Sequence, residues 1–270
     1  MKEMNYHYSD EELVNRIWDK EEIKDLISRH AYYQSSDLRE LELDTLWVQS
    51  RENQWTATLG SNWGFYVGMP EIKRYYVQNH RKHRQDQLKP YIAAGVLTEC
   101  GDENLGFGCW DMHTISSPLL QLAGDGKTAR GLWYDCGQLT VGSPDGTADE
   151  NFIFGLVAVD FIKENGKWKI WHMILENDHT VPVGELYSNI PVYRNQGSDP
   201  AEVEFGIPTI HELVHDSTYG WADHFPDIPE PYDTYTDENS YSQLGKRAKY
   251  YTISREYDIP SVMARDKRWE

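Results

Sequence analysis

Basic residues are scarce in this chain of 270 residues. Its 26 Lys and Arg side chains stand against 44 Asp and Glu, which leaves a formal net charge of −18 at pH 7. The one basic cluster, residues 80–84, is short and is followed at once by acidic and amide side chains. Binding to nucleic acid or to an anionic membrane surface requires clustered Lys and Arg. We therefore expect neither kind of partner.

Cysteine is also rare, and long apolar runs are missing. The three cysteines, Cys100, Cys109 and Cys136, form no CxxC or CxxH spacing, so neither a disulfide framework nor a zinc site is predicted. No apolar run approaches the roughly 20 residues that span a bilayer, and the first ten residues lack the apolar stretch of a secretory signal. We expect a soluble cytoplasmic protein whose thiols are reduced.

Several familiar catalytic patterns are absent from the sequence. The glycine pairs at 106–108 and 124–126 lack the strand–loop–helix setting of a nucleotide site. No G-x-S-x-G nucleophile elbow occurs. Any chemistry is therefore expected to depend on proton transfer and on the shape of a pocket, with no cofactor and no metal.

Aromatic residues, in contrast, make up 13% of the chain, and the N-terminal third has helical periodicity. Apolar residues recur at spacings of three and four over residues 10–36, and Ser9 is the predicted N-cap. A second short helix is predicted over 38–49. A third begins near Gly68 and Pro70, since proline is favoured in a first helical turn.

The periodicity then changes to that of strands, predicted at 111–122, 128–141, 152–163 and 167–178. Asn165-Gly166 joins the last two strands as a tight hairpin. A two-residue turn pairs residues whose numbers sum to 331. The predicted pairs are Lys163–Trp168, Phe161–Ile170, Val159–His172 and Val157–Ile174.

This pairing places His172 on a face that is otherwise apolar apart from Lys163. It leaves Ile162, Trp171 and Met173 on the opposite face, where we expect another copy of the chain to pack, giving a homodimer or higher homo-oligomer. The layout is α+β: three N-terminal helices packed on a strongly curved antiparallel sheet that forms a cone with an internal pocket. Residues 1–184 form this domain, and residues 185–270 form an extension that wraps the core or a neighbouring subunit.

Histidines carry the candidate chemistry. His113 follows Asp111 by two residues on a predicted strand, so both side chains project from one side. A carboxylate beside an imidazole raises its pKa, which suits general acid–base catalysis. His30 lies on the apolar face of the first helix, and His172 lies on the apolar strand face. We expect these groups to converge on one apolar cavity, as in a small-molecule site. Three histidines could also bind a metal, but no short ligand spacing supports that alternative.

Five segments together resemble the SnoaL-like branch of the nuclear transport factor 2-like superfamily. They are residues 23–32, 68–72, 112–119, 124–133 and 159–171. The resemblance covers roughly residues 10–180 and implies a cone of helices on a bent sheet around a deep pocket. Members of this family include cofactor-free dehydratases, cyclases, isomerases and lyases, alongside proteins that only bind.

The resemblance has two departures. Relatives commonly carry an Asp shortly after the tyrosine at the end of the first helix, whereas here the acid is displaced to Asp37. The loop over residues 80–108 is longer than in compact members.

The resulting hypothesis is a cofactor-independent lyase, most simply a dehydratase, that acts on a hydrophobic, ring-containing hydroxylated molecule. His113, oriented by Asp111, would remove a proton, and His30 or His172 would protonate the leaving oxygen. The side chains expected to pack against the substrate are Tyr33, Trp47 and Trp133. A non-catalytic binding or assembly domain is the alternative, as is an isomerase or carbon–carbon lyase that uses the same pocket.

Overall fold

The computed structural model describes residues 7–61, 64–184, 210–211 and 226–242. The helices are α1 (Asp10–Ser35), α2 (Arg39–Thr45), α3 (Arg51–Thr56), α4 (Met69–Lys73), the π-helical segment η1 (Arg74–Asn79) and α5 (His80–Ala93), with short 3₁₀ turns η2 (Asp102–Asn104) and η7 (Asp237–Asn239). The strands are β1 (Thr58–Ser61), β2 (Gly64–Val67), β3 (Cys109–Leu122), β4 (Thr128–Gly142), β5 (Ala148–Glu164), β6 (Lys167–Pro182) and β7 (Ile210–His211).

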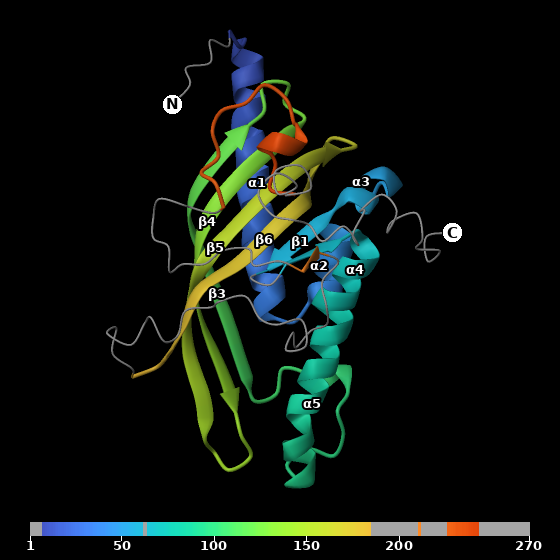
Figure 1. Cartoon of the computed structure of the whole chain (residues 1–270), viewed down its shortest axis with the longest axis vertical. Helices are drawn as coiled ribbons and strands as arrows, with labels where there is room; N and C mark the ends of the chain where they lie inside the picture. The colour runs from blue at the N-terminus through green and yellow to red at the C-terminus, as the bar shows by residue number, and fades with distance from the viewer. Residues whose placement is uncertain (1–6, 62–63, 185–209, 212–225, 243–270) are drawn as a thin grey trace.

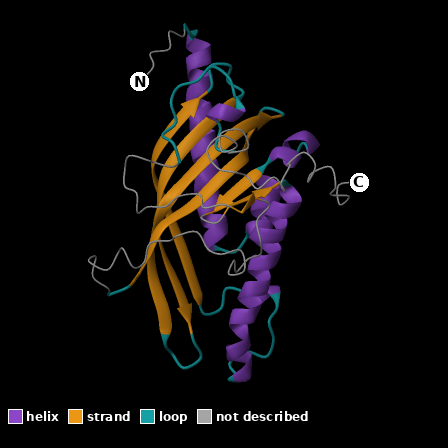
Figure 2. Cartoon of the chain, viewed as in Figure 1, coloured by secondary structure: helices purple, strands orange, loops and turns teal. Residues whose placement is uncertain are grey.

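The strands form one curved sheet in the order β3-β4-β5-β6-β1-β2-β7 (Figure 1). β3 to β6 form an antiparallel meander, as the sequence predicted. β1, however, runs parallel to β6, so the sheet is mixed and not purely antiparallel. The main hydrophobic core lies between the sheet and the helices α1, α2 and α4–η1 (Figure 2). The expected α+β arrangement of helices on a curved sheet is confirmed.

Helix α1 begins at Asp10, as the sequence predicted, because Ser9 and Glu12 form reciprocal hydrogen bonds across its first turn. Ser9 Oγ accepts the backbone N–H of Glu12, and the Glu12 carboxylate accepts the backbone N–H of Ser9 at 2.7 Å. This capping box satisfies two backbone donors that the helix itself leaves unpaired. Only the second half of α1 is buried, through Ile23, Leu26, Ile27 and His30.

The prediction of a loop over residues 80–108 is wrong for its first half. Residues 80–93 form helix α5, which continues directly from α4 and η1. Its sequence is polar on almost every face and buries only Arg84, Leu88 and Tyr91. A helix with so narrow an apolar stripe has little of the periodicity that identifies a helix from sequence.

The hairpin of β5 and β6 has the predicted turn but only part of the predicted pairing. Lys163–Trp168 and Phe161–Ile170 face each other as expected. A β-bulge then inserts Trp171, so that His172 pairs with Asp160 and Ile174 pairs with Ala158. A bulge moves every later side chain of its strand to the opposite face.

The bulge also removes the apolar surface expected to bind another copy. Met173 is fully buried in the main core, against which Ile162 and Trp171 pack with part of their surface. The predicted partner surface of Ile162, Trp171 and Met173 is therefore wrong.

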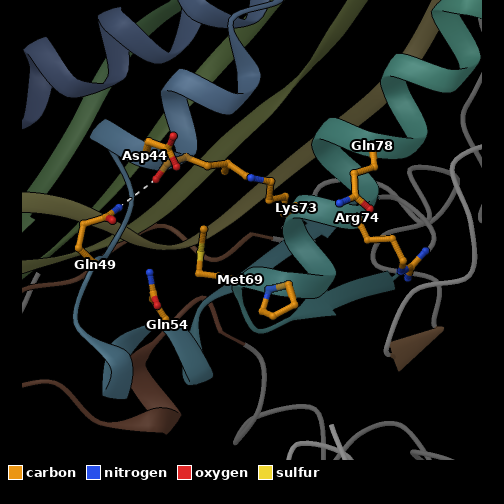
Figure 3. Close-up of a pocket in the computed structure, with 9 residues that line it drawn as sticks. Asp44, Gln49, Gln54, Met69, Lys73, Arg74 and Gln78 are labelled. Atoms are coloured by element: carbon orange, nitrogen blue, oxygen red, sulfur yellow. Dashed lines mark hydrogen bonds between the residues drawn. The ribbon is translucent and has the colours of Figure 1, made fainter. Parts of the chain in front are cut away.

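A surface pocket of about 360 Å³ lies between α2, α3 and α4 (Figure 3). Its lining is mixed: apolar Leu43, Met69 and Pro70, the charged Asp44, Lys73 and Arg74, and the amides Gln49, Gln54 and Gln78. Lys73 already pairs with Glu40 at 2.6 Å, and Arg74 pairs with Glu71 at 2.6 Å. The charges of this pocket are therefore largely neutralised within the protein.

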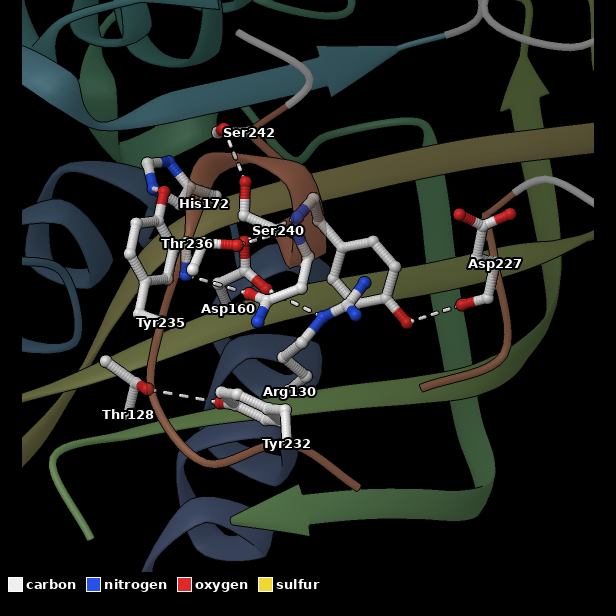
Figure 4. Close-up of polar contacts among 12 residues, drawn as sticks. Thr128, Arg130, Asp160, His172, Asp227, Tyr232, Tyr235, Thr236, Ser240 and Ser242 are labelled. Atoms are coloured by element: carbon white, nitrogen blue, oxygen red, sulfur yellow. Dashed lines mark hydrogen bonds and ion pairs between the residues drawn. The ribbon is translucent and has the colours of Figure 1, made fainter. Parts of the chain in front are cut away.

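Residues 226–242, here called the strap, cover part of the outer face of the sheet, next to Arg130 of β4 and Asp160 of β5 (Figure 4). Tyr241 is its anchor: the ring lies 4.1 Å from the guanidinium of Arg130, and its backbone N–H donates to Asp160 at 2.6 Å. The ring is packed in a second apolar cluster with Phe65, Val67, Leu132, Leu156, Ala158 and Ile174. At the β3–β4 turn, the backbone N–H of Gly124 donates to Tyr232 O at 2.9 Å.

None of the helices in the described part of the chain combines the length and apolar character needed to cross a membrane.

Replacing Tyr241 with alanine should lower the free energy of unfolding by about 3–5 kcal/mol, the usual range for truncating a fully buried aromatic side chain. Tyr241 is 1% exposed, whereas Tyr32 is 75% exposed. Tyr32→Ala is therefore the matched control, with an expected change within about 0.5 kcal/mol. Urea unfolding followed by circular dichroism measures both. Equal stabilities of the two variants would show that the strap does not hold to the sheet.

Candidate functional site

The imidazole of His113 lies between two carboxylates on the face of the sheet that meets helix α2. Its Nε2 is 3.0 Å from Asp111 Oδ1 on the same strand, β3. Its Nδ1 is 2.8 Å from Asp135 Oδ2 on the neighbouring strand β4. Only 8% of the His113 side chain is exposed. The sequence prediction that Asp111 and His113 project from one side of a strand is confirmed, and Asp135 is an additional partner.

These two contacts determine the charge of His113. Burial by itself lowers the pKa of the imidazole, but the hydrogen bonds with Asp111 and Asp135 outweigh burial and raise the pKa to about 9. Since carboxylates only accept hydrogen bonds, both ring nitrogens carry a proton. At neutral pH, His113 is therefore an imidazolium that donates both of its N–H groups.

Arg39 of helix α2 connects the group of Asp111, His113 and Asp135 to the helices. Its Nη2 lies 3.7 Å from Asp111 Oδ2, and its Nε lies 3.4 Å from Asp37 Oδ1. The guanidinium also lies 4.6 Å from the centre of the Tyr76 ring. Burial raises the pKa of Asp111, but His113 and Arg39 outweigh it, so the net shift is downward and Asp111 stays ionised.

Asp37 also contacts a second histidine, His80. His80 Nδ1 lies 3.3 Å from Asp37 Oδ1, and 19% of the His80 side chain is exposed. Burial lowers the pKa of His80, Arg39 lowers it further, and Asp37 compensates only in part. At neutral pH His80 is therefore uncharged, in contrast to His113.

The backbone that carries Asp37 and His80 is irregular at both positions. Asp37 has a φ of 54°, in the left-handed region that few residues other than glycine adopt. His80 follows directly on the π-helical segment η1. Strained residues and π-helical turns are found preferentially at functional sites.

A third histidine, His30, belongs to a fully buried network around Glu42. Glu42 Oε1 accepts from His30 Nδ1 at 2.9 Å and from Trp47 Nε1 at 3.1 Å, and Oε2 accepts from Tyr76 at 2.9 Å. His30 and Glu42 are both 0% exposed. Through Tyr76, Arg39 and Asp111 this network reaches His113.

His172 does not join the others, which corrects the prediction. The bulge at Trp171 turns His172 to the outer face, where its Nδ1 lies 3.2 Å from Thr58 Oγ1 and its Nε2 lies 3.5 Å from Tyr235 of the strap (Figure 4). Complete burial lowers its pKa to about 3. His172 is thus a neutral, packed residue that holds the strap on the far side of the sheet.

The aromatic side chains expected to contact a substrate lie at different depths. Trp47 and Trp133 are enclosed in the main core, 0% and 3% exposed. Tyr33 packs against that core with part of its surface accessible. Of the three, only Tyr33 is accessible to a small molecule in the observed conformation.

Arg39, Glu42, His80 and Asp135 were not identified from the sequence. Arg39 and Glu42 are three residues apart on α2, a spacing that places both on one helix face, but charged residues on a helix usually face solvent. Asp135 is one of several polar residues on β4. His80 stands in a basic run that is typical of an exposed surface.

The pocket between α2, α3 and α4 is a separate site, since none of its nine lining residues belongs to the histidine clusters. In the described parts of the chain, no group of three or more His, Cys, Asp and Glu residues is arranged to hold a metal ion.

Solved structures of low sequence identity align with much of this chain. The hexachlorocyclohexane dehydrochlorinase LinA-type3 from Novosphingobium barchaimii is 14% identical, with 64% of this chain and 95% of that chain covered and a TM-score of 0.43. Aln2 from a Streptomyces species is 18% identical, with 64% and 95% covered and a TM-score of 0.38. A protein of unknown function with a cystatin-like fold from Nostoc punctiforme is 20% identical, with 60% and 92% covered and a TM-score of 0.32.

Because these TM-scores all lie below 0.5, the family assignment depends on sequence. The curated proteins provide no match. The sequence profile of the SnoaL-like domain, however, matches residues 15–174, more than half of the chain, and includes Asp111, His113 and Asp135. The family expected from the sequence is thereby confirmed: this protein belongs to the SnoaL-like domain family.

Proposed function

We propose that this protein is a cofactor-independent lyase that removes water from a hydrophobic, ring-containing hydroxylated molecule by general acid–base catalysis. One observation carries the proposal: His80 and His113 belong to the same polar cluster, yet their surroundings shift their pKa values in opposite directions. Titratable groups whose pKa values are driven apart supply an acid and a base at the same pH. Membership of a family that includes cofactor-free dehydratases adds support.

The roles that follow differ from those expected from the sequence. An imidazolium that donates both of its N–H groups is a poor base at neutral pH, so we assign His113 as the proton donor. His80, neutral and partly exposed, is the proton acceptor, and Asp37 orients its ring. Asp111 is more exposed than Asp135, 22% against 8%, so a substrate can approach His113 from the Asp111 side, at Nε2.

The reaction balances with these two residues alone. His80 takes a proton from the carbon next to a carbonyl group, and the electron pair of that C–H bond forms the new carbon–carbon double bond. The bond between the neighbouring carbon and its hydroxyl oxygen breaks, and His113 Nε2 delivers its proton to that oxygen to release water. Exchange with solvent then returns a proton to His113 and removes one from His80.

Three partly exposed apolar side chains support a ring-shaped substrate. Tyr33, Tyr75 and Ile115 pack against the main core without being fully buried, and Ile115 follows His113 by two residues on the same side of β3. Trp47 and Trp133 belong to the same core but are fully enclosed in it. Aromatic and aliphatic walls with a few convergent polar groups are typical of small-molecule sites.

A structural role for the cluster is the competing interpretation. Both N–H groups of His113 are already bonded within the protein, as they would be in an arrangement that only stabilises the fold. Isomerisation or carbon–carbon cleavage would use the same residues, so the product distinguishes these reactions from dehydration. Assembly into homo-oligomers and a cytoplasmic location stay predictions from the sequence.

Activity can be tested on a panel of cyclic β-hydroxy ketones, in which loss of water creates a conjugated enone that absorbs in the ultraviolet. His113→Ala and His80→Ala should each lower kcat by about 10²–10⁴-fold, the usual contribution of one general acid or base. Mass spectrometry of the product identifies dehydration, isomerisation or cleavage.

The matched control for these variants is His7→Gln, because His7 is exposed and lies outside the cluster. Circular dichroism and urea unfolding establish that each variant is folded. Undiminished turnover in a folded His113→Ala or His80→Ala variant would contradict the assignment. A wild-type chain inactive on the whole panel would favour the structural role.

The pH dependence provides a second test. Activity requires a neutral His80, so kcat/KM should rise with pH through the pKa of His80, below 6.5. It also requires a protonated His113, so kcat/KM should fall as pH passes about 9. Asp135→Asn removes one of the two carboxylates that raise the pKa of His113 and should move the alkaline limb to lower pH. An alkaline limb that is unchanged in this variant would mean that His113 is not the acid.

A further inference from the structure

The guanidinium of Arg39 is paired by charge but not by hydrogen bonds. Its Nη2 lies 3.7 Å from Asp111 Oδ2, and its Nε lies 3.4 Å from Asp37 Oδ1. Both separations exceed the roughly 2.7–3.2 Å of an N–H···O hydrogen bond. Nε is buried and donates to no residue in the described parts of the chain. Since a guanidinium has several N–H groups and only donates, Arg39 keeps donors that these carboxylates do not accept.

This side chain is as accessible as the proposed acid. Its exposed fraction is 9%, against 8% for His113. The ring of Tyr76 covers one face of the guanidinium at 4.6 Å, and the Tyr76 hydroxyl donates to Glu42 at 2.9 Å, which holds that ring in place. The N–H groups of a guanidinium point outward in its own plane. The stacking therefore determines the plane in which Arg39 can donate.

Arg39 also shares a carboxylate with each of the two proposed catalytic histidines. Asp37 Oδ1, next to Arg39 Nε, lies 3.3 Å from His80 Nδ1. Asp111, next to Arg39 Nη2, has its other oxygen 3.0 Å from His113 Nε2. In a β-hydroxy ketone, the carbonyl group, the acidic C–H bond and the leaving hydroxyl lie on successive carbon atoms. The groups that act on them must adjoin one another, as Arg39, His80 and His113 do.

The proposed dehydration develops a charge that neither histidine meets. As His80 takes the proton, the C–H electron pair forms a double bond to the carbonyl carbon, and the π pair of the carbonyl moves onto its oxygen. When that pair returns, the double bond shifts to the neighbouring carbon, the C–O bond breaks, and His113 protonates the leaving oxygen. The carbonyl oxygen is negative in between. A positioned donor aimed at such an oxygen is worth about 10²–10³-fold in kcat.

We infer that Arg39 binds the carbonyl oxygen of the substrate and stabilises the negative charge that develops on it. This inference rests on the proposed lyase function and narrows its substrate class to uncharged carbonyl compounds. In the cluster, three carboxylates stand against two cations: Asp37, Asp111 and Asp135 against Arg39 and His113. A ligand carboxylate would add to this excess of negative charge, whereas a neutral carbonyl group becomes negative only as its neighbouring proton leaves.

Deuterium exchange at the α-carbon of cyclohexanone tests Arg39 separately from the loss of water, because this ketone has no hydroxyl to expel. The wild-type full-length chain in D₂O should catalyse the exchange. Arg39→Met should lower its kcat by about 10²–10³-fold, the usual loss for one donor to an oxyanion. Arg51→Met on α3 is the matched control, since Arg51 is exposed and lies outside the cluster, and its kcat should equal that of the wild type. Mass spectrometry of the recovered ketone measures each rate.

Infrared spectroscopy gives a readout that a purely structural role of Arg39 would not change. Cyclohex-2-enone labelled with ¹³C at its carbonyl group should show a lower stretching frequency when bound to the wild type than in water, and the shift should vanish in folded Arg39→Met. If Arg39→Met does not fold, the wild type decides the question. Its Arg39 guanidinium ¹⁵N resonance should shift with cyclohex-2-enone and stay unchanged with cyclohexene, which lacks the oxygen.

Four results would each overturn the inference: no exchange by the wild type, undiminished exchange by folded Arg39→Met, a bound carbonyl stretch equal to that in water, or an Arg39 resonance that ignores the enone. Binding of cyclohexanecarboxylate as tight as that of cyclohexanone would overturn the assigned substrate class.

Failure of this inference is distinguishable from failure of the proposed function. Enone formation from β-hydroxy ketones at the wild-type kcat by folded Arg39→Met would refute the role of Arg39 and leave the lyase standing. Exchange and a carbonyl shift that both depend on Arg39, in a chain that forms no enone from any ketone of the panel, would do the reverse.

Discussion

Arg39 is the buried cation on which the polar cluster depends. A guanidinium that is only 8% exposed is tolerable only if it is paired, because removing an unpaired charge from water costs several kcal/mol. Its partners come from three places: Asp37 after α1, Tyr76 on η1 and Asp111 on β3. The need to neutralise one buried charge thus keeps the helices and the sheet in register around the histidines.

Local electrostatics shift the pKa values of the two histidines in this cluster in opposite directions. His113 has a carboxylate at each nitrogen, and the two contacts overcome the cost of burying its charge. His80 has one carboxylate, but the charge of Arg39 also acts on it and adds to the effect of burial. The difference between one and two carboxylate partners therefore produces opposite charge states within a few side chains of each other, and acid–base chemistry requires that difference.

A single extra residue in β6 determines which side chains of this strand point to each face of the sheet. Up to Ile170 the strand directs the predicted residues into the core, but the bulge at Trp171 sends His172 to the outer face. There, Asp160 and Arg130 lie beside it in the sheet and hold Tyr241 of the strap. Part of the outer face is thus covered by the strap, while the histidine cluster lies on the face that meets the helices.

The sequence by itself determined the fold class, the first helix with its cap, the meander with its Asn165-Gly166 turn, and the pairing of Asp111 with His113. All of these depend on contacts between residues close in the chain, where periodicity and turn chemistry are readable. Only the tertiary structure decided that Asp135 contacts the second ring nitrogen of His113 and that Asp37 lies beside His80. It also decided that His172 lies on the opposite face of the sheet. These outcomes depend on the register of strands and on the burial of charge between segments far apart in the chain. A single bulge can reverse such a register, and local sequence does not encode it.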